Sequence, residues 1–156
     1  MPTYTALLTL HILVGTLGLL LGPIVAWTDL ESPPHPSFNW WSWYLKTVAA
    51  ICITATVMVL WHRPDLWWLI PISALTYALA DLGHRSRHRP GTWTHAYVHG
   101  LGGSYTALWT ATLVVAFTLN GPLYGPSELI AWLGPTLFAL PLLEIWRRHL
   151  PAPIPA

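Results

Sequence analysis

Charged side chains are scarce in this sequence. Asp, Glu, Lys and Arg make up 8% of its 156 residues, whereas a soluble globular domain carries about a quarter of its residues in these four types. Because so few charges cannot cover a globular surface in water, we expect lipid to cover most of the chain. The formal net charge of +1 provides no strong positive field, so nucleic acid is excluded as a partner.

The chain has a single cysteine and no complete catalytic motif. The single cysteine, Cys52, lies in an apolar stretch and has no second cysteine in the chain for a disulfide. The absence of any His-His dipeptide argues against the histidine boxes of membrane desaturases and hydroxylases. The glycine-rich segment 100–104 follows no expected strand and lacks the Lys-Ser/Thr ending of a phosphate-binding loop. The sequence therefore favours a role that is not enzymatic.

Long apolar runs are abundant instead. Five of them approach the length of about 20 residues that a helix needs to cross a bilayer, and they cover residues 5–27, 43–61, 66–82, 96–119 and 129–146. We therefore predict an all-α fold, a polytopic integral membrane helical bundle with five transmembrane helices. This bundle forms one domain over residues 1–150, and a frayed, proline-rich tail follows at residues 151–156.

The basic residues predict how this bundle is oriented. With five spans, Arg63 lies alone on one side of the membrane. The other six basic residues share the opposite side: Lys46, Arg85, Arg87, Arg89, Arg147 and Arg148. Because Lys and Arg are enriched in cytoplasmic loops, we predict that the N-terminus lies outside and the C-terminus in the cytoplasm, with the protein in the cell inner (plasma) membrane.

Small residues mark two helix faces that are suited to close packing. Without a hydrophobic drive between helices in lipid, association depends on small side chains and on hydrogen bonds between helices. These faces consist of His11, Gly15, Gly18 and Gly22 in the first run and of Gly103, Ala107 and Ala111 in the fourth. We expect them to pack the first span against the fourth, or to join two copies of the chain in a homo-oligomer.

Histidine is unusually frequent, with eight residues in the chain. Two pairs have HxxxH spacing, His84 with His88 and His95 with His99, and residues four apart lie on the same face of a helix. Asp81 precedes His84 by three residues, inside the third run, where an ionisable side chain should face the bundle interior with a partner. The candidate site is therefore a cluster near the cytoplasmic face: Asp81, His84, His88, His95 and His99.

Three interpretations of this cluster stay open. In the first, its side chains form hydrogen bonds between helices or contact lipid phosphates together with the neighbouring arginines. In the second, the cluster binds a metal ion, or His84 and His99 bind a b-type haem, since neutral imidazole is a ligand for zinc, copper and iron. In the third, Asp81, His99, His11 and His62 line a path for protons or a small solute.

Two segments of the chain resemble a known group of proteins. They are residues 11–23, His-Ile-Leu-Val-Gly-Thr-Leu-Gly-Leu-Leu-Leu-Gly-Pro, and residues 99–111, His-Gly-Leu-Gly-Gly-Ser-Tyr-Thr-Ala-Leu-Trp-Thr-Ala. Both resemble small bacterial multi-span membrane proteins that are grouped as a domain of unknown function. The resemblance implies a helical inner-membrane bundle and supplies no catalytic residues.

These observations lead to one preferred role and two alternatives. The preferred role is a small integral membrane protein that works as a binding or accessory protein and has membrane lipids as partners. The alternatives are a metal- or b-haem-binding redox protein and a subunit of a proton or small-solute pathway.

Overall fold

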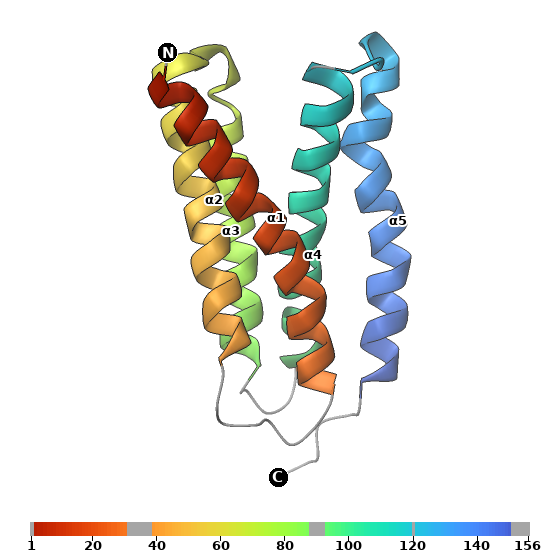
Figure 1. Cartoon of the computed structure of the whole chain (residues 1–156). Coiled ribbons are helices and arrows are strands. Elements are labelled where there is room, and N and C mark those ends of the chain that lie inside the picture. The colour runs from red at the N-terminus through yellow and green to blue at the C-terminus, as the bar shows by residue number, and fades with distance from the viewer. Residues whose placement is uncertain (1, 31–38, 88–92, 120, 151–156) are drawn as a thin grey trace. The chain divides into compact units, whose positions relative to one another are not determined.

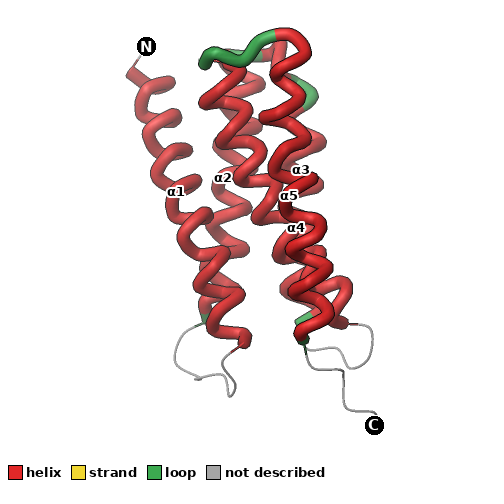
Figure 2. Tube along the Cα trace, turned by 90° about the vertical axis from the view of Figure 1, so that its right-hand side faces the viewer, coloured by secondary structure: helices red, strands yellow, loops and turns green. Residues whose placement is uncertain are grey.

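The structure, a computed structural model, describes residues 2–30, 39–87, 93–119 and 121–150 of the chain. Helices account for nearly all of these residues, and no strand occurs among them (Figure 2). The long elements are α1 (Pro2–Leu30), α2 (Trp40–His62), α3 (Leu69–Ser86), α4 (Trp93–Val114) and α5 (Glu128–His149). The predicted all-α fold is confirmed, with a helix at each of the five apolar runs.

Four of the helical segments are long and apolar enough to cross a membrane. They are Thr3–Asp29, Trp40–His62, Thr94–Thr118 and Gly125–His149. These segments identify the chain as a helical membrane protein. The helix α3 is not among them, so the third span stays a prediction, and so do the orientation and the identity of the membrane.

The third helix begins later than the sequence predicts. A short 3₁₀ turn, η1 (Pro64–Leu66), occupies the start of the expected span, and α3 begins only at Leu69. Pro71 then lies in the first turn of α3, where its missing N–H would have had no partner within the helix. The helix continues to Ser86, four residues beyond the predicted end at residue 82.

The chain divides into two compact units, Met1–Asp81 and Leu82–Ala156, with the boundary inside α3. In the first unit α1 packs along α2, and in the second α4 packs along α5 (Figure 1). The single domain over residues 1–150 stays a prediction. The predicted tail, residues 151–156, lies outside the described residues.

Three pairs of polar or aromatic side chains join α1 to α2 along its length. In a bilayer such contacts replace the hydrophobic drive that holds soluble helices together. The pairs are Tyr4 with His62 (ring centroids 4.7 Å apart), His11 Nδ1 with Thr54 Oγ1 (2.8 Å), and the Trp41 Nε1–H donating to Asp29 Oδ2 (2.6 Å). Because residue numbers rise along α1 as they fall along α2, the two helices are antiparallel.

The glycine face predicted in the first run is partly buried. Gly18 and Gly22 are buried, whereas Gly15 is half-buried, and apart from its own chain neighbours and the local helix backbone no described heavy atom lies within 4 Å of the position that a Cβ would take. The GxxxG motif therefore lies on an interior face of the protein. Its pairing with the fourth span, or with a second copy of the chain, stays a prediction.

The helix α4 approaches α5 closely at one glycine. A Cβ on Gly102 would overlap the side chain of Leu143, so the two helices are close enough there to exclude any larger residue unless Leu143 moves. The α-helical part of α4 ends at Val114, earlier than the predicted end at residue 119. A π-helical turn, Val115–Leu119, completes the segment.

Candidate functional site

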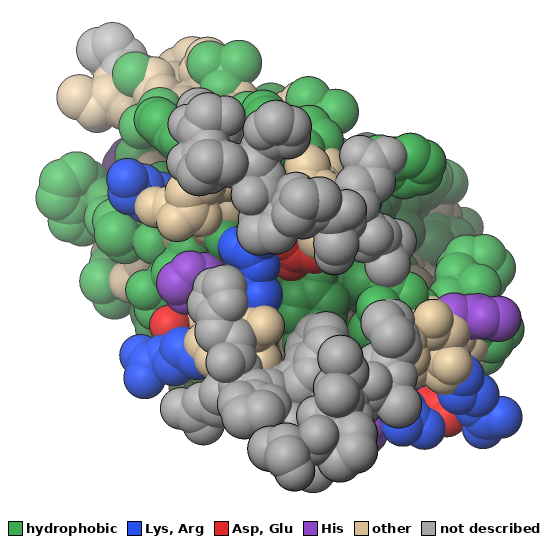
Figure 3. Space-filling view, turned by 90° about the horizontal axis from the view of Figure 1, so that it is seen from below, with side chains coloured by type: hydrophobic (Ala, Val, Ile, Leu, Met, Phe, Trp, Pro, Cys, Tyr) green, Lys and Arg blue, Asp and Glu red, His purple; other side chains and the backbone are tan. Residues whose placement is uncertain are grey.

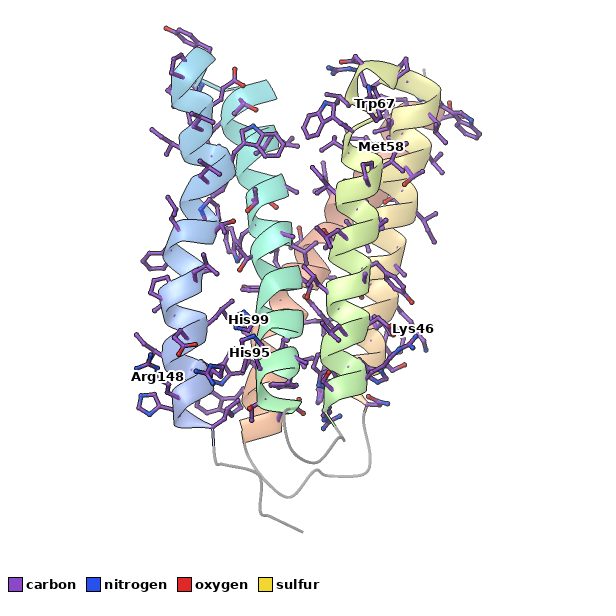
Figure 4. All side chains as sticks on the ribbon, turned by 180° about the vertical axis from the view of Figure 1, so that it is seen from behind. Lys46, Met58, Trp67, His95, His99 and Arg148 are labelled. Carbon is purple, nitrogen blue, oxygen red and sulfur yellow. The ribbon has the colours of Figure 1, made fainter. Side chains whose placement is uncertain are left out.

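Two histidines lie near the start of α4. His95 and His99 are four residues apart on this helix, and their ring centroids are 4.2 Å apart with an interplanar angle of 53°. His95 is exposed and His99 is half-buried. In Figure 4 the two labelled rings lie one above the other along the same side of α4. The helix thus pairs these two imidazoles, as the HxxxH spacing predicts.

At the end of α5 one carboxylate holds two guanidinium groups. Arg147 donates from Nη2 to Glu144 Oε1 at 2.7 Å and from Nε to Oε2 at 2.8 Å, a two-point ion pair. Arg148 donates from Nε to Glu144 Oε1 at 2.8 Å. The three- and four-residue spacing of these side chains on one helix face favours this local ion pair. With one negative and two positive groups, the triad carries a net positive charge.

Arg148 is the more accessible of the two arginines. Its side chain is 72% exposed, against 35% for Arg147. Within the described part of the chain its hydrogen bond uses Nε alone, so both Nη atoms can donate to a further acceptor. Glu144 therefore holds Arg148 through Nε, while the two Nη atoms of Arg148 point outward and can bind another group.

The histidine pair and the triad belong to one end of unit 2. Tyr97 lies between the two histidines in the sequence, and Trp146 lies between Glu144 and Arg147. Tyr97 and Trp146 pack edge to face between the same two helices, with ring centroids 5.8 Å apart. We call the group of His95, His99, Glu144, Arg147 and Arg148 the α4–α5 polar end. Figure 3 looks onto the end where α4 begins and α5 ends, and shows basic, acidic and histidine side chains at its rim.

The structure places the predicted cluster on two helices. Asp81 and His84 lie half-buried near the end of α3, and His95 and His99 lie near the start of α4. His88 lies outside the described residues. Across the described ranges, no three or more His, Cys, Asp or Glu side chains form a group that could hold a metal ion. The five-residue metal site and the haem pairing of His84 with His99 are therefore not supported by the geometry and stay predictions.

Sequence reasoning missed two features of this end. It did not include Glu144, Arg147 and Arg148 in the candidate site, although antiparallel neighbouring helices would bring the last turn of α5 to the first turns of α4. It also placed the small-residue face of the fourth run at Gly103, whereas Gly102 makes the close approach to Leu143. Gly102 and Gly103 point to different sides of α4, so which of them faces α5 depends on how α4 is rotated about its own axis. No pattern in the sequence defines that rotation.

No protein-family model, curated protein or solved structure matches this chain. The resemblance of residues 11–23 and 99–111 to small bacterial multi-span membrane proteins stays a prediction.

Proposed function

We propose that the chain is a small integral protein of the plasma membrane that works as a binding or accessory protein. In this proposal α3 is a fifth span, the N-terminus lies outside and the C-terminus lies in the cytoplasm. The four long apolar helices support a membrane protein, and the uneven distribution of basic residues supports a cytoplasmic C-terminus. The α4–α5 polar end then lies at the cytoplasmic membrane interface.

The ligand class proposed for this end is the phosphate headgroup of an anionic phospholipid. One observation carries the proposal: Glu144 holds Arg147 and Arg148 side by side, and Arg148 remains 72% exposed at its side chain. Guanidinium forks match phosphate oxygens and bind them through charge-assisted hydrogen bonds. The cytoplasmic leaflet supplies anionic headgroups at this depth, and basic side chains near its surface are each attracted by about 1 kcal/mol.

Native mass spectrometry on detergent-purified protein tests this proposal. The protein is incubated with equal amounts of phosphatidylglycerol and phosphatidylethanolamine, and the bound lipids are counted. Arg148→Gln should reduce phosphatidylglycerol binding about fivefold, the change that roughly 1 kcal/mol produces. Glu128→Gln, which changes a charge at the opposite end of α5, is the control and should leave phosphatidylglycerol binding unchanged. Equal phosphatidylglycerol binding by wild type and Arg148→Gln would contradict the proposal.

A second candidate function is transition-metal binding by the histidine pair. It is favoured by the 4.2 Å separation of the His95 and His99 rings on one helix face, because imidazole ligands suit copper, zinc and nickel. Titration with Cu²⁺ should show one equivalent bound by wild type, and none by His95→Ala or His99→Ala. His149→Ala, a histidine on α5, is the control. If all four proteins bind Cu²⁺ alike, this candidate fails.

A further inference from the structure

A second polar and aromatic group lies in unit 1, where α1 begins and α2 ends. Tyr4 in the first turns of α1 packs against His62, the last residue of α2, with ring centroids 4.7 Å apart. The backbone leaves the helix at Arg63 (φ −137°, ψ 61°), and Pro64 opens the turn η1. This break in the helix places the side chains that follow beyond the apolar length of α2, which corresponds to the level of the lipid headgroups when α2 spans a bilayer.

The charges at this place are balanced. Arg63 donates from Nε to Asp65 Oδ1 at 3.1 Å and from Nη2 to Asp65 Oδ2 at 2.9 Å. Their side chains are 49% and 58% exposed. The ion pair thus has no net charge, keeps Nη1 of Arg63 for another acceptor, and offers the outer lone pairs of the carboxylate to a cation. The α4–α5 polar end, by contrast, carries a net positive charge.

Two tryptophans flank the ion pair. Trp61 is 75% exposed and Trp67 is 67% exposed. Figure 4 shows Trp67 near Met58, at the end of unit 1 opposite Lys46. Exposed indole rings are favourable at the membrane–water interface, where the ring meets lipid and its N–H meets polar groups. An indole face also attracts an organic ammonium group.

We propose that this end of unit 1 binds the headgroup of a zwitterionic phospholipid, which carries one phosphate and one ammonium. The surface consists of Tyr4, Trp61, His62, Arg63, Asp65 and Trp67. Arg63 donates to the phosphate, Asp65 accepts from the ammonium, and the tryptophan rings cover the ammonium and the glycerol region. The phosphate of the headgroup complements Arg63 and its ammonium complements Asp65. The headgroup can therefore bind without breaking the ion pair between Arg63 and Asp65. An anionic headgroup has no ammonium for Asp65 and gains no net attraction. This inference goes beyond the proposed function, since it concerns a different end of the chain and a different lipid class.

The experiment measures the ratio of bound phosphatidylethanolamine to bound phosphatidylglycerol by native mass spectrometry, from an equal mixture. Asp65→Asn leaves Arg63 as a lone cation and should lower this ratio about fivefold, the size of one exposed charge contact. Trp67→Ala should lower phosphatidylethanolamine binding, and Trp67→Phe should restore most of it, because an aromatic face is sufficient for the cation contact.

The control separates this proposal from the one for the α4–α5 polar end. Arg148→Gln should lower phosphatidylglycerol binding and so raise the ratio of bound phosphatidylethanolamine to phosphatidylglycerol, the opposite direction from Asp65→Asn. If Asp65→Asn and Trp67→Ala both keep the wild-type amount of bound phosphatidylethanolamine, the proposal for unit 1 is overturned, whatever Arg148→Gln does. Far-ultraviolet circular dichroism confirms that each variant remains helical, as expected for changes at exposed side chains.

Discussion

At the scale of single residues, one hydrogen bond joins the apolar helices α1 and α2 at His11 and Thr54. His11 Nδ1 and Thr54 Oγ1 are 2.8 Å apart, and the tautomer of His11 decides which of the two groups donates. Thr54 Oγ1 also lies 2.8 and 3.0 Å from the carbonyl oxygens of Ala50 and Ile51 within its own helix. The contact with His11 is therefore the part of this hydroxyl's bonding that connects the two helices.

Removing this hydroxyl should weaken the α1–α2 pair. We expect Thr54→Val to lower the free energy of unfolding in bicelles by about 0.6–2 kcal/mol, the range of hydrogen bonds between helices in lipid. Thr56→Val is the matched control, because the Thr56 hydroxyl donates to Cys52 O within α2 at 2.8 Å. Equal effects of the two substitutions would show that the contact with His11 adds nothing.

The ion pair at the end of α2 predicts a pH response. The Arg63 guanidinium, through its hydrogen bonds, holds the pKa of Asp65 below its ordinary value. Because the folded-state pKa is lowered, the contact stabilises the fold above the unfolded pKa of about 4 and is lost as pH falls through the folded pKa. Carboxyl-carbon NMR titration should show the pKa of Asp65 rising in Arg63→Gln. An unchanged pKa in that variant would argue against the contact.

At the scale of elements, the apolar runs predicted the helices well and their ends less well. Four of the runs are long enough to signal a span by composition alone. The start of α3 was misplaced because Pro64 allows a 3₁₀ turn before the helix, and the end of α4 because the last turn is π-helical at Val115–Leu119. Local turn chemistry of this kind does not alter the apolar pattern, so the pattern cannot reveal it.

The sequence predicts which residues share a face of one helix, but not which helices pack against each other. The HxxxH spacing correctly placed His95 and His99 on one face, since that depends only on the helical repeat. Glu144, Arg147 and Arg148 join the α4–α5 polar end because α5 packs against α4. From the glycine face of the first run we predicted that α1 packs against α4, and we did not predict the contact with α5.

The close approach of α4 and α5 predicts opposite effects for the same substitution at two glycines. Gly102→Ala should cost about 1–3 kcal/mol, because the new methyl group displaces Leu143. Gly15→Ala should stabilise α1 by about 0.5–1 kcal/mol, since apart from its own chain neighbours and the local helix backbone no heavy atom lies within 4 Å of its Cβ position. Unfolding free energies in bicelles measure both effects.

A double variant identifies the cause of the loss at Gly102. With Leu143→Ala in the same chain the overlap is gone, so the two changes together should cost less than the sum of the single changes. Strict additivity would mean that Gly102 and Leu143 do not meet as the structure shows.

At the scale of the whole molecule, the distribution of basic residues depends on whether α3 crosses the membrane. If it does, Arg63 alone lies outside and six basic residues share the cytoplasmic side. If it does not, Lys46 lies alone on one side, and six basic residues again share the other: Arg63, Arg85, Arg87, Arg89, Arg147 and Arg148. The same rule then places both termini in the cytoplasm. The charge pattern therefore favours a cytoplasmic α4–α5 polar end with four spans or with five, and the side of the N-terminus distinguishes the two arrangements.

Cysteine labelling on intact cells tests this central point most directly. In a Cys52→Ser background, Thr3→Cys and Leu150→Cys report the two ends of the bundle through a maleimide that does not cross membranes. We predict that Thr3→Cys reacts from outside and that Leu150→Cys reacts only after the membrane is permeabilised. The same response from both sites would mean an even number of spans and contradict the five-span arrangement, and reaction of Leu150→Cys on intact cells would contradict the cytoplasmic position of the α4–α5 polar end.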